Sequence, residues 1–386
     1  MEKYYNDAII GNKEITASYT KKGELLRVFY PNTDYRQFVD YFHTGVKIND
    51  SNMIYLHDDI NNQYEQYFTE NTNILNTNIL NTYFELNILQ TDFVCINKNV
   101  IVKKYKFKNK NNIDLNVSFI IHSALLTNDN NQVSGYYVND SLVQYMHDYT
   151  FSICSNNKVK ASQINNNEAN IGNGVIWDKD YIGMSNDSSI CYDLGTLKPN
   201  EEKELDIYIT ISHGSSIKEI ETKITETKNI DVKKELDKAK KYWEKYVKEH
   251  DTIKLPESNT KYMKKLEKIY KRTILLYPLL TNELTGGISA AVEIDENRTK
   301  CGRYSYCWPR DAIFVTNSLD ILGMTKETEK YYKTFCKMTQ SKNGMWEQRF
   351  YTDGSLAPCW GYQIDETASV VYGIYNHYEH TKNAKF

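Results

Sequence analysis

The spacing of apolar side chains changes near residue 217, and this change limits the possible folds more than any other feature of the chain. Before it, short runs rich in β-branched and aromatic residues are separated by turns of Asn, Asp, Gly and Lys. Several runs alternate apolar with polar residues, which is typical of half-buried antiparallel strands. The clearest runs are residues 24–31, 83–96, 100–107, 115–126 and 204–212. Because no helical pattern intervenes, we predict a large antiparallel β-sandwich over residues 1–216.

After residue 217 the apolar residues recur at the intervals of an amphipathic helix. Asp231 can cap a helix that runs to about Glu249. The buried stripe of this helix would consist of Leu236, Ala239, Trp243 and Val247. We expect residues 217–256 to form a helical linker, and residues 257–386 to form a second, helical domain.

The composition is that of an ordinary globular chain: of 386 residues, 40% are hydrophobic and 25% are charged, with a formal net charge of −3. Nearly balanced charge gives no electrostatic reason to expect nucleic acid or an anionic membrane as a partner. No stretch approaches the roughly 18 apolar residues that span a bilayer, and residues 1–20 lack the apolar core of a signal peptide. We therefore expect a cytoplasmic protein of about two or three domains.

Seven cysteines are scattered along the chain without the CxxC or Cys/His spacing of a metal site. They are Cys95, Cys154, Cys191, Cys301, Cys307, Cys336 and Cys359. In a cytoplasmic protein we expect them to remain reduced thiols. His377 and His380 lie close together, but no third ligand accompanies them, so we interpret both as polar positions on an amphipathic helix. The sequence thus predicts no metal and no cofactor.

Two blocks in the helical part, residues 303–319 and residues 345–373, place charged residues next to aromatic ones. Arg310 and Asp311 follow Trp308 in the first block, and Asp365 and Glu366 follow Trp360 in the second. This mixture suits a sugar ring, whose hydroxyls bind charged groups and whose C–H face packs on an aromatic side chain. The same residues could instead form a structural salt bridge and a helix cap. Apolar residues at helical intervals after Glu366 predict that a helix begins there, and they are Ala368, Val371, Tyr372, Tyr375 and Tyr378.

The strings CGRYSYCWPRDA and WGYQIDETA resemble the GGYGYCWPRDA and WGYQLDETA signatures of glycoside hydrolase family 15, in its bacterial and archaeal glucoamylase-like branch. Glucodextranases and some trehalases belong to the same family. The N-terminal string IIGNKEITASYTKKGELLRVFYPNTD resembles the opening strands of the sandwich domain of that branch. The resemblance implies an N-terminal β-sandwich (supersandwich) followed by an (α/α)6 barrel, with an α-glucan oligosaccharide or polysaccharide as substrate.

The resemblance also implies roles for individual residues of the two blocks. Glu366 matches the general acid of an inverting hydrolase that releases glucose from non-reducing chain ends. Arg310 and Asp311 match the pair that grips the hydroxyls of the terminal glucose, with Trp308 beside them. From the sequence itself, the turn at Asp353 and Gly354 would project the preceding aromatic residues, so we expect the adjoining subsites to be lined by Trp346, Arg349, Tyr351 and Asp353. Trp360 and Asp365 complete the expected substrate-binding residues. Glu366 and Asp365 could alternatively act only as N-terminal helix caps.

The second catalytic carboxylate of the family lies much further along the chain than residue 386. We therefore expect an incomplete (α/α)6 barrel over residues 257–386, truncated at its C-terminus and without the general base. Several alternatives remain open at this point. They are an inactive remnant or sugar-binding protein, a trehalase or glucodextranase, a phosphorylase, and a sandwich that serves as a protein-interaction module.

Overall fold

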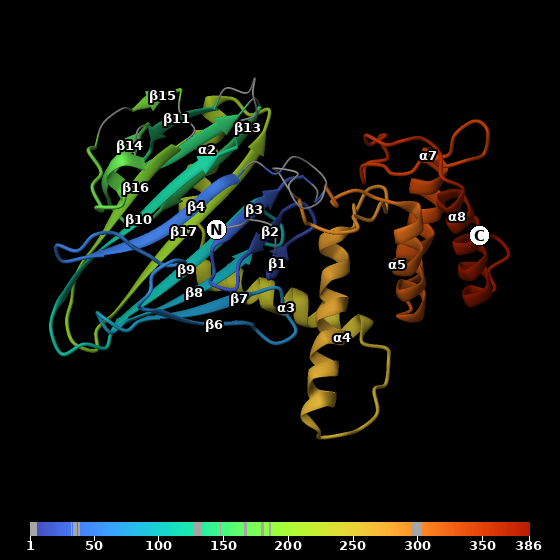
Figure 1. Ribbon diagram of the computed structural model, residues 1–386, viewed down its shortest axis with the longest axis horizontal. Helices are drawn as coiled ribbons and strands as arrows, with labels where there is room; N and C mark the ends of the chain where they lie inside the picture. Colours follow the sequence, from blue (N-terminus) through green and yellow to red (C-terminus); the bar gives the residue numbers. More distant parts are fainter. Residues whose placement is uncertain are drawn as a thin grey trace.

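The computed structural model describes residues 6–31, 33, 37, 39–126, 133–146, 148–165, 168–178, 181–184, 187–294 and 303–386. Two antiparallel sheets occupy the N-terminal part, and most helices occupy the C-terminal part (Figure 1). The first sheet consists of β1 (Ala8–Gly11), β2 (Thr16–Tyr19), β3 (Leu25–Phe29), β4 (Val39–Ile48), β5 (Ile54–Tyr55), β10 (Leu115–Leu125), β14 (Val159–Ile164) and β16 (Asp187–Leu197). The second consists of β6 (Asn62–Phe68), β7 (Leu75–Asn81), β8 (Leu86–Val94), β9 (Val100–Asn109), β11 (Val133–Val138), β12 (Ser141–Met146), β13 (Tyr149–Ser155), β15 (Ile182–Gly183) and β17 (Glu202–His213).

Both sheets are antiparallel throughout the pairs that are described. The first has the order β1-β2-β3-β4-β10-β16-β14, with β5 paired to β4, and the second has the order β15-β11-β12-β13-β17-β9-β8-β7-β6. One continuous hydrophobic core takes side chains from both sheets, such as Phe119 of the first and Tyr105 of the second. The five strand runs expected from the sequence are confirmed as β3, β8, β9, β10 and β17. Buried and less buried residues alternate along much of β8 and β9, whereas β3 is buried at every position.

The helices follow β17, apart from the short α1. Their bounds are α1 (Glu168–Ile171), α2 (Ile217–Lys228), α3 (Val232–His250), α4 (Lys261–Leu280), α5 (Pro309–Ile321), α6 (Thr325–Lys330), the π-helical η1 (Tyr331–Cys336), α7 (Lys337–Thr339) and α8 (Ile364–Thr381). Ser216 caps α2 in a capping box with Glu219, and Asp231 caps α3 as predicted. A second core joins α2 and α3 to the second sheet, on the face opposite the shared core.

The helical part is fixed to the sheets at several buried points. Trp243 of α3 and Leu279 of α4 belong to one buried cluster, and Ile9 of β1 packs against it. Arg272 of α4 donates a hydrogen bond of 2.9 Å to the carbonyl of Thr72, and its guanidinium stacks 3.8 Å from the Phe68 ring centroid. These contacts place α4 against the edge of the sheets, as Figure 1 shows.

Within residues 257–386, the described helices form four consecutive segments: α4, α5, the run α6–η1–α7, and α8. Proline stands in the first turn of α5, and Gly323 ends this helix with a φ of +75°. Helices α5 and α8 are parallel neighbours, since Arg310 pairs with Glu366 at their first turns while Asp320 pairs with His377 near their last turns. The N-termini of α5 and α8 therefore lie at the same end of the helix pair.

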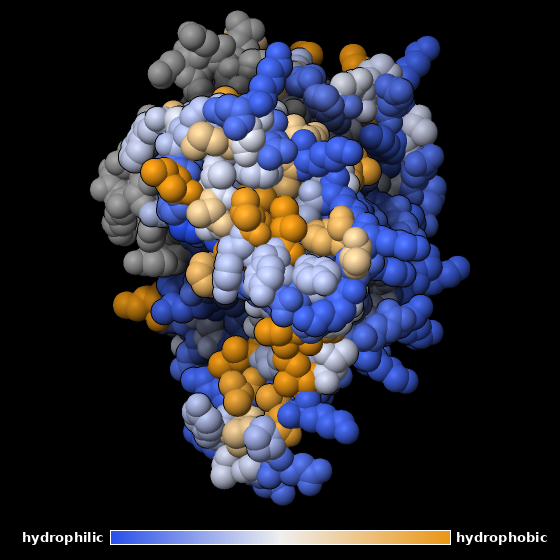
Figure 2. Space-filling view, turned by 90° about the vertical axis from the view of Figure 1, so that its right-hand side faces the viewer, coloured by the Kyte–Doolittle hydropathy of each residue, from blue (hydrophilic) through white to orange (hydrophobic). Residues whose placement is uncertain are grey.

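The outer side of α8 is apolar and exposed. The helix predicted after Glu366 is confirmed, but the residues Val371, Tyr372 and Tyr375 of its apolar stripe face solvent, whereas Glu366, Val370, Gly373 and His377 are buried. Leu266 and Ile269 in the first half of α4 are likewise exposed. Figure 2 shows hydrophobic surface gathered on this side of the molecule. No described element covers these stripes, which is why residues with the spacing of a buried face stay exposed.

Among the described residues, no helix has both the length and the apolar character needed to cross a membrane. The cysteines expected to be reduced are free thiols at Cys95, Cys154, Cys191, Cys336 and Cys359. Cys301 lies outside the described residues.

Candidate active site

The first turns of α5 and α8 bring four charged residues together. Trp308 is the N-cap residue of α5 in an extended conformation, so Arg310 and Asp311 lie in the first turn of that helix. Gln363 has the same position in α8, which places Asp365 and Glu366 in its first turn. Because the two helices are parallel, side chains that lie far apart in the sequence meet at one end.

Arg310 is the centre of this group. Its Nη1 atom lies 2.6 Å from Oδ2 of Asp365 and 3.2 Å from Oε1 of Glu366, and its Nη2 atom lies 3.5 Å from Oδ2 of Asp311. The backbone N–H of Arg310 also donates a hydrogen bond of 2.7 Å to Oε2 of Glu366. Arg310, Asp311 and Asp365 are about half exposed, whereas the Glu366 side chain is completely buried.

One guanidinium thus faces three carboxyl groups, so it cannot neutralise all three when they are ionised. Burial raises the pKa of Glu366 to about 7, the bond from the Arg310 N–H and the Arg310 charge oppose this rise, and the charges of Asp365 and Asp311 add to it. The hydrogen bond from Arg310 lowers the pKa of Asp365. Glu366 is therefore the carboxyl of this group that holds a proton closest to neutral pH. Its Oε1 atom has no hydrogen-bond partner among the described residues.

Aromatic rings lie next to the charged group. Tyr306 packs edge-on against Trp308, with ring centroids 5.7 Å apart, and against Tyr351 at 5.4 Å. The Arg349 guanidinium lies 5.0 Å from the Tyr306 ring centroid and 5.8 Å from that of Trp308. Tyr304 extends this cluster to the surface, where it is partly exposed.

The structure does not bring the other two predicted tryptophans into this group. Trp346 is buried in the helical core with Tyr331 and Phe335, and its indole N–H donates to the carbonyl of Cys336 at 2.9 Å. Trp360 is 89% exposed. Tyr362 is also exposed, so neither ring buries the acid, and Glu366 is instead enclosed by the packing of α5 against α8.

Sequence reasoning missed two further features. Tyr306 is the centre of the aromatic cluster, and the alternation of Tyr304, Tyr306 and Trp308 could have indicated one shared face. His377, interpreted as a polar position on an amphipathic helix, does lie on helix α8, but it is fully buried and its Nδ1 lies 2.9 Å from a carboxylate oxygen of Asp320. His380 is exposed as expected.

The raised pKa of Glu366 predicts how its replacement by Gln changes stability with pH. The folded pKa of about 7 exceeds the ordinary 4.5, so the folded protein loses stability as pH rises from about 4.5 to 7 and this buried group must ionise. Glutamine cannot ionise. We therefore compare the unfolding free energy of E366Q with that of wild type at each pH. This difference should be about 3 kcal/mol more favourable to E366Q at pH 8 than at pH 4.

Urea denaturation of both proteins at pH 4 and pH 8 measures this difference. Glu379→Gln, at an exposed position of the same helix, should show no such pH-dependent gain. An equal effect of E366Q at both pH values would contradict the pKa assigned to Glu366.

Comparison with known proteins places this geometry in a familiar fold. No protein-family model matches the chain. An uncharacterized glycosyl hydrolase of Methanocaldococcus jannaschii is 26% identical over 397 residues, which cover 99% of this chain and 61% of that protein. A bacterial glucoamylase complexed with acarbose has a TM-score of 0.78 at 16% identity, covering 97% of this chain and 56% of that structure. A proposed kojibiose phosphorylase from the human microbiome has a TM-score of 0.67 at 13% identity, covering 100% of this chain and 55% of that structure.

The chain therefore has a glycoside-hydrolase-like fold. It spans 61% of the length of the curated relative and a little over half the length of the two structures.

Proposed function

We propose that the protein is a glucoamylase-like glycoside hydrolase that releases glucose from the non-reducing ends of α-glucans. Glu366 would be the general acid that protonates the leaving glycosidic oxygen. The observation that carries this proposal is a buried glutamic acid with a pKa of about 7 at the shared open end of two parallel helices. A general acid works best when its pKa lies near the working pH, and Glu366 meets this condition.

We further propose that the two sheets are the sandwich domain, over residues 1–216, and that residues 217–256 link it to a barrel. The four helical segments of residues 257–386 would then be the first part of an (α/α)6 barrel. Support comes from the parallel course of α5 and α8, since a ring of helical hairpins requires its inner helices to run in one direction. The exposed apolar stripes of α4 and α8 are the faces that further helices of such a barrel would cover.

The substrate would lie over the half-exposed residues around Glu366. Arg310 and Asp311 offer a cation and a carboxylate to sugar hydroxyls, and Asp365 offers a second carboxylate. Trp308 and Arg349, which both contact the Tyr306 ring, would form the neighbouring wall of the substrate site. We propose that hydroxyl contacts replace part of the Arg310–Asp365 pair and thereby open Oε1 of Glu366 to the glycosidic oxygen.

Inverting hydrolysis also requires a carboxylate that activates water on the other face of the sugar, roughly 6.5–9.5 Å from the acid. We assign no residue of this chain to that role. In the proposal the base belongs to barrel helices that are not among residues 1–386.

The test is glucose release from maltooligosaccharides by the protein isolated from its native source, with its intact mass measured in parallel. We expect β-glucose as the first product, without added phosphate. A requirement for phosphate would replace hydrolysis by phosphorolysis, a reaction that the second structural relative makes worth testing. If the protein cleaved only trehalose or only an α-1,6-glucan, that sugar would replace maltooligosaccharides as the proposed substrate. Sugar binding without any turnover would favour a non-catalytic protein.

A further inference from the structure

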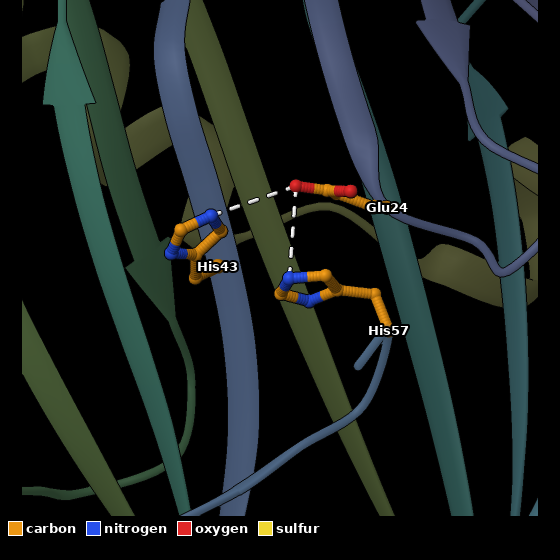
Figure 3. A group of neighbouring side chains, drawn as sticks. All are labelled: Glu24, His43 and His57. Carbon is orange, nitrogen blue, oxygen red and sulfur yellow. Dashed lines mark ion pairs between the residues drawn. The ribbon is translucent and has the colours of Figure 1, made fainter. Parts of the chain in front are cut away.

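A second group of chemically active side chains lies on the first sheet, away from the helices. Glu24 directly precedes β3, His43 lies within β4, and His57 follows β5 by two residues. Figure 3 shows the two imidazole rings and the carboxylate converging on one point. Phe42, next to His43 in β4, belongs to the core between the sheets. Because successive side chains of a strand alternate, His43 faces the opposite, outer side of the sheet.

The distances within this group are unusual for hydrogen bonds. Nε2 of His43 lies 3.5 Å and Nε2 of His57 lies 3.7 Å from the same oxygen, Oε1 of Glu24. An N–H···O hydrogen bond measures about 2.7–3.2 Å, so neither contact is a good one. Ligand atoms bound at about 2.0–2.2 Å to a tetrahedral metal ion, however, lie roughly 3.3–3.6 Å from one another. The three donor atoms all lie within 4.8 Å of one another.

We propose that Glu24, His43 and His57 bind a divalent transition-metal ion, with Zn²⁺ the ion best suited to two imidazoles and one carboxylate. This inference does not depend on the function proposed for the helical site. Imidazole ligands favour Zn²⁺ and its neighbours in the first transition series over Mg²⁺ or Ca²⁺, which prefer shells of oxygen ligands.

The surroundings favour a metal with one open position. Glu24 and His57 are buried, while the His43 side chain is 28% exposed, so the ion would reach solvent on the side of His43. Three protein ligands leave a fourth position for water or a small ligand.

Neighbouring rings hold His43 in place. Tyr41 stacks on His43 with ring centroids 4.7 Å apart, and the Tyr41 hydroxyl lies 3.2 Å from Nε2 of His122. The His57 ring also stacks on His43, with ring centroids 4.8 Å apart. The bound ion would connect the start of β3, strand β4 and the segment after β5. Its ligands Glu24 and His57 are 33 positions apart in the sequence.

The test is binding of Zn²⁺ alone to the full chain, measured by titration calorimetry and by metal content after gel filtration of protein first treated with a chelator. We expect one ion per chain and a raised melting temperature with Zn²⁺. Glu24→Gln and His43→Ala should each weaken Zn²⁺ binding by at least about 100-fold and abolish the rise in melting temperature. Glu24→Gln preserves shape, so it tests the ligand even if loss of an imidazole perturbs folding.

His213→Ala is the matched control, because His213 is an exposed histidine that pairs with Asp148 elsewhere on the sheets. It should bind Zn²⁺ as wild type does. The absence of stoichiometric Zn²⁺ on the wild-type chain would overturn the proposal, and so would unchanged binding by Glu24→Gln and His43→Ala. Equal binding of Mg²⁺ and Zn²⁺ would also overturn it, since it would indicate a nonspecific anionic surface.

Discussion

Replacing Glu366 by Gln is expected to lower the rate of glucose release from maltooligosaccharides by about 1000-fold, within the range that general acid catalysis contributes. Glutamine has nearly the same size and can still accept the hydrogen bond from the backbone N–H of Arg310. It cannot give a proton to the leaving oxygen. The measurement is kcat and KM of both proteins, in the form isolated from the native source.

The pH profile separates this role from a structural one. Wild-type kcat should fall as pH rises above about 7, because Glu366 then loses the proton that it must donate. Asp365→Asn should raise KM more than it lowers kcat, since Asp365 is exposed and its pKa is lowered by Arg310, so it holds no proton to give. Glu379→Gln, on the exposed side of the same helix, should leave both constants unchanged. Full activity of E366Q would remove Glu366 from the mechanism.

Much of the fold follows from local patterns. Strands β8 and β9 were predictable because alternation of side chains decides which face of a strand is buried, and β3, β10 and β17 because short runs rich in β-branched and aromatic residues lie between turns. The start of α3 was predictable because Asp231 satisfies a free N–H of the first turn, and the start of α5 because proline is tolerated only there. These signals need no knowledge of distant residues.

Positions that depend on tertiary packing were less predictable. Trp346 is buried because it packs against Tyr331 and Phe335 of η1, whereas Trp360 precedes α8 and stays exposed, and no local pattern specifies either outcome. The burial of His377 was missed because its partner Asp320 lies on another helix. Glu24, His43 and His57 come from three strand segments, so their convergence arises from strand pairing and leaves no regular spacing in the sequence. Arg310 and Glu366 were identified by motif, but their common environment required the structure.

The largest expected effect on stability concerns a buried ion pair in the second sheet. Asp92 of β8 and Lys103 of β9 are cross-strand partners, with Oδ1 and Nζ 2.7 Å apart, and both side chains are almost completely buried. Gln90 donates a further hydrogen bond of 2.6 Å to Asp92. Asp92→Ala would leave the Lys103 ammonium in the core without its partner. We expect a loss of about 3–5 kcal/mol in the free energy of unfolding, measured by urea denaturation.

A neighbouring pair in the same sheet offers the control. Lys104 and Glu204 are also joined across strands, at 2.5 Å, but their side chains are 26% and 52% exposed. Glu204→Ala should therefore cost less than about 1 kcal/mol, because water replaces the lost partner. The double variant Asp92→Leu/Lys103→Met should recover most of the stability, since it removes both buried charges together. If Asp92→Ala and Glu204→Ala cost the same, or if the double variant were no more stable than Asp92→Ala, desolvation of Lys103 would not be the cause. If Asp92→Ala proves too unstable to purify, the prediction can still be tested, because the double variant Asp92→Leu/Lys103→Met is expected to fold.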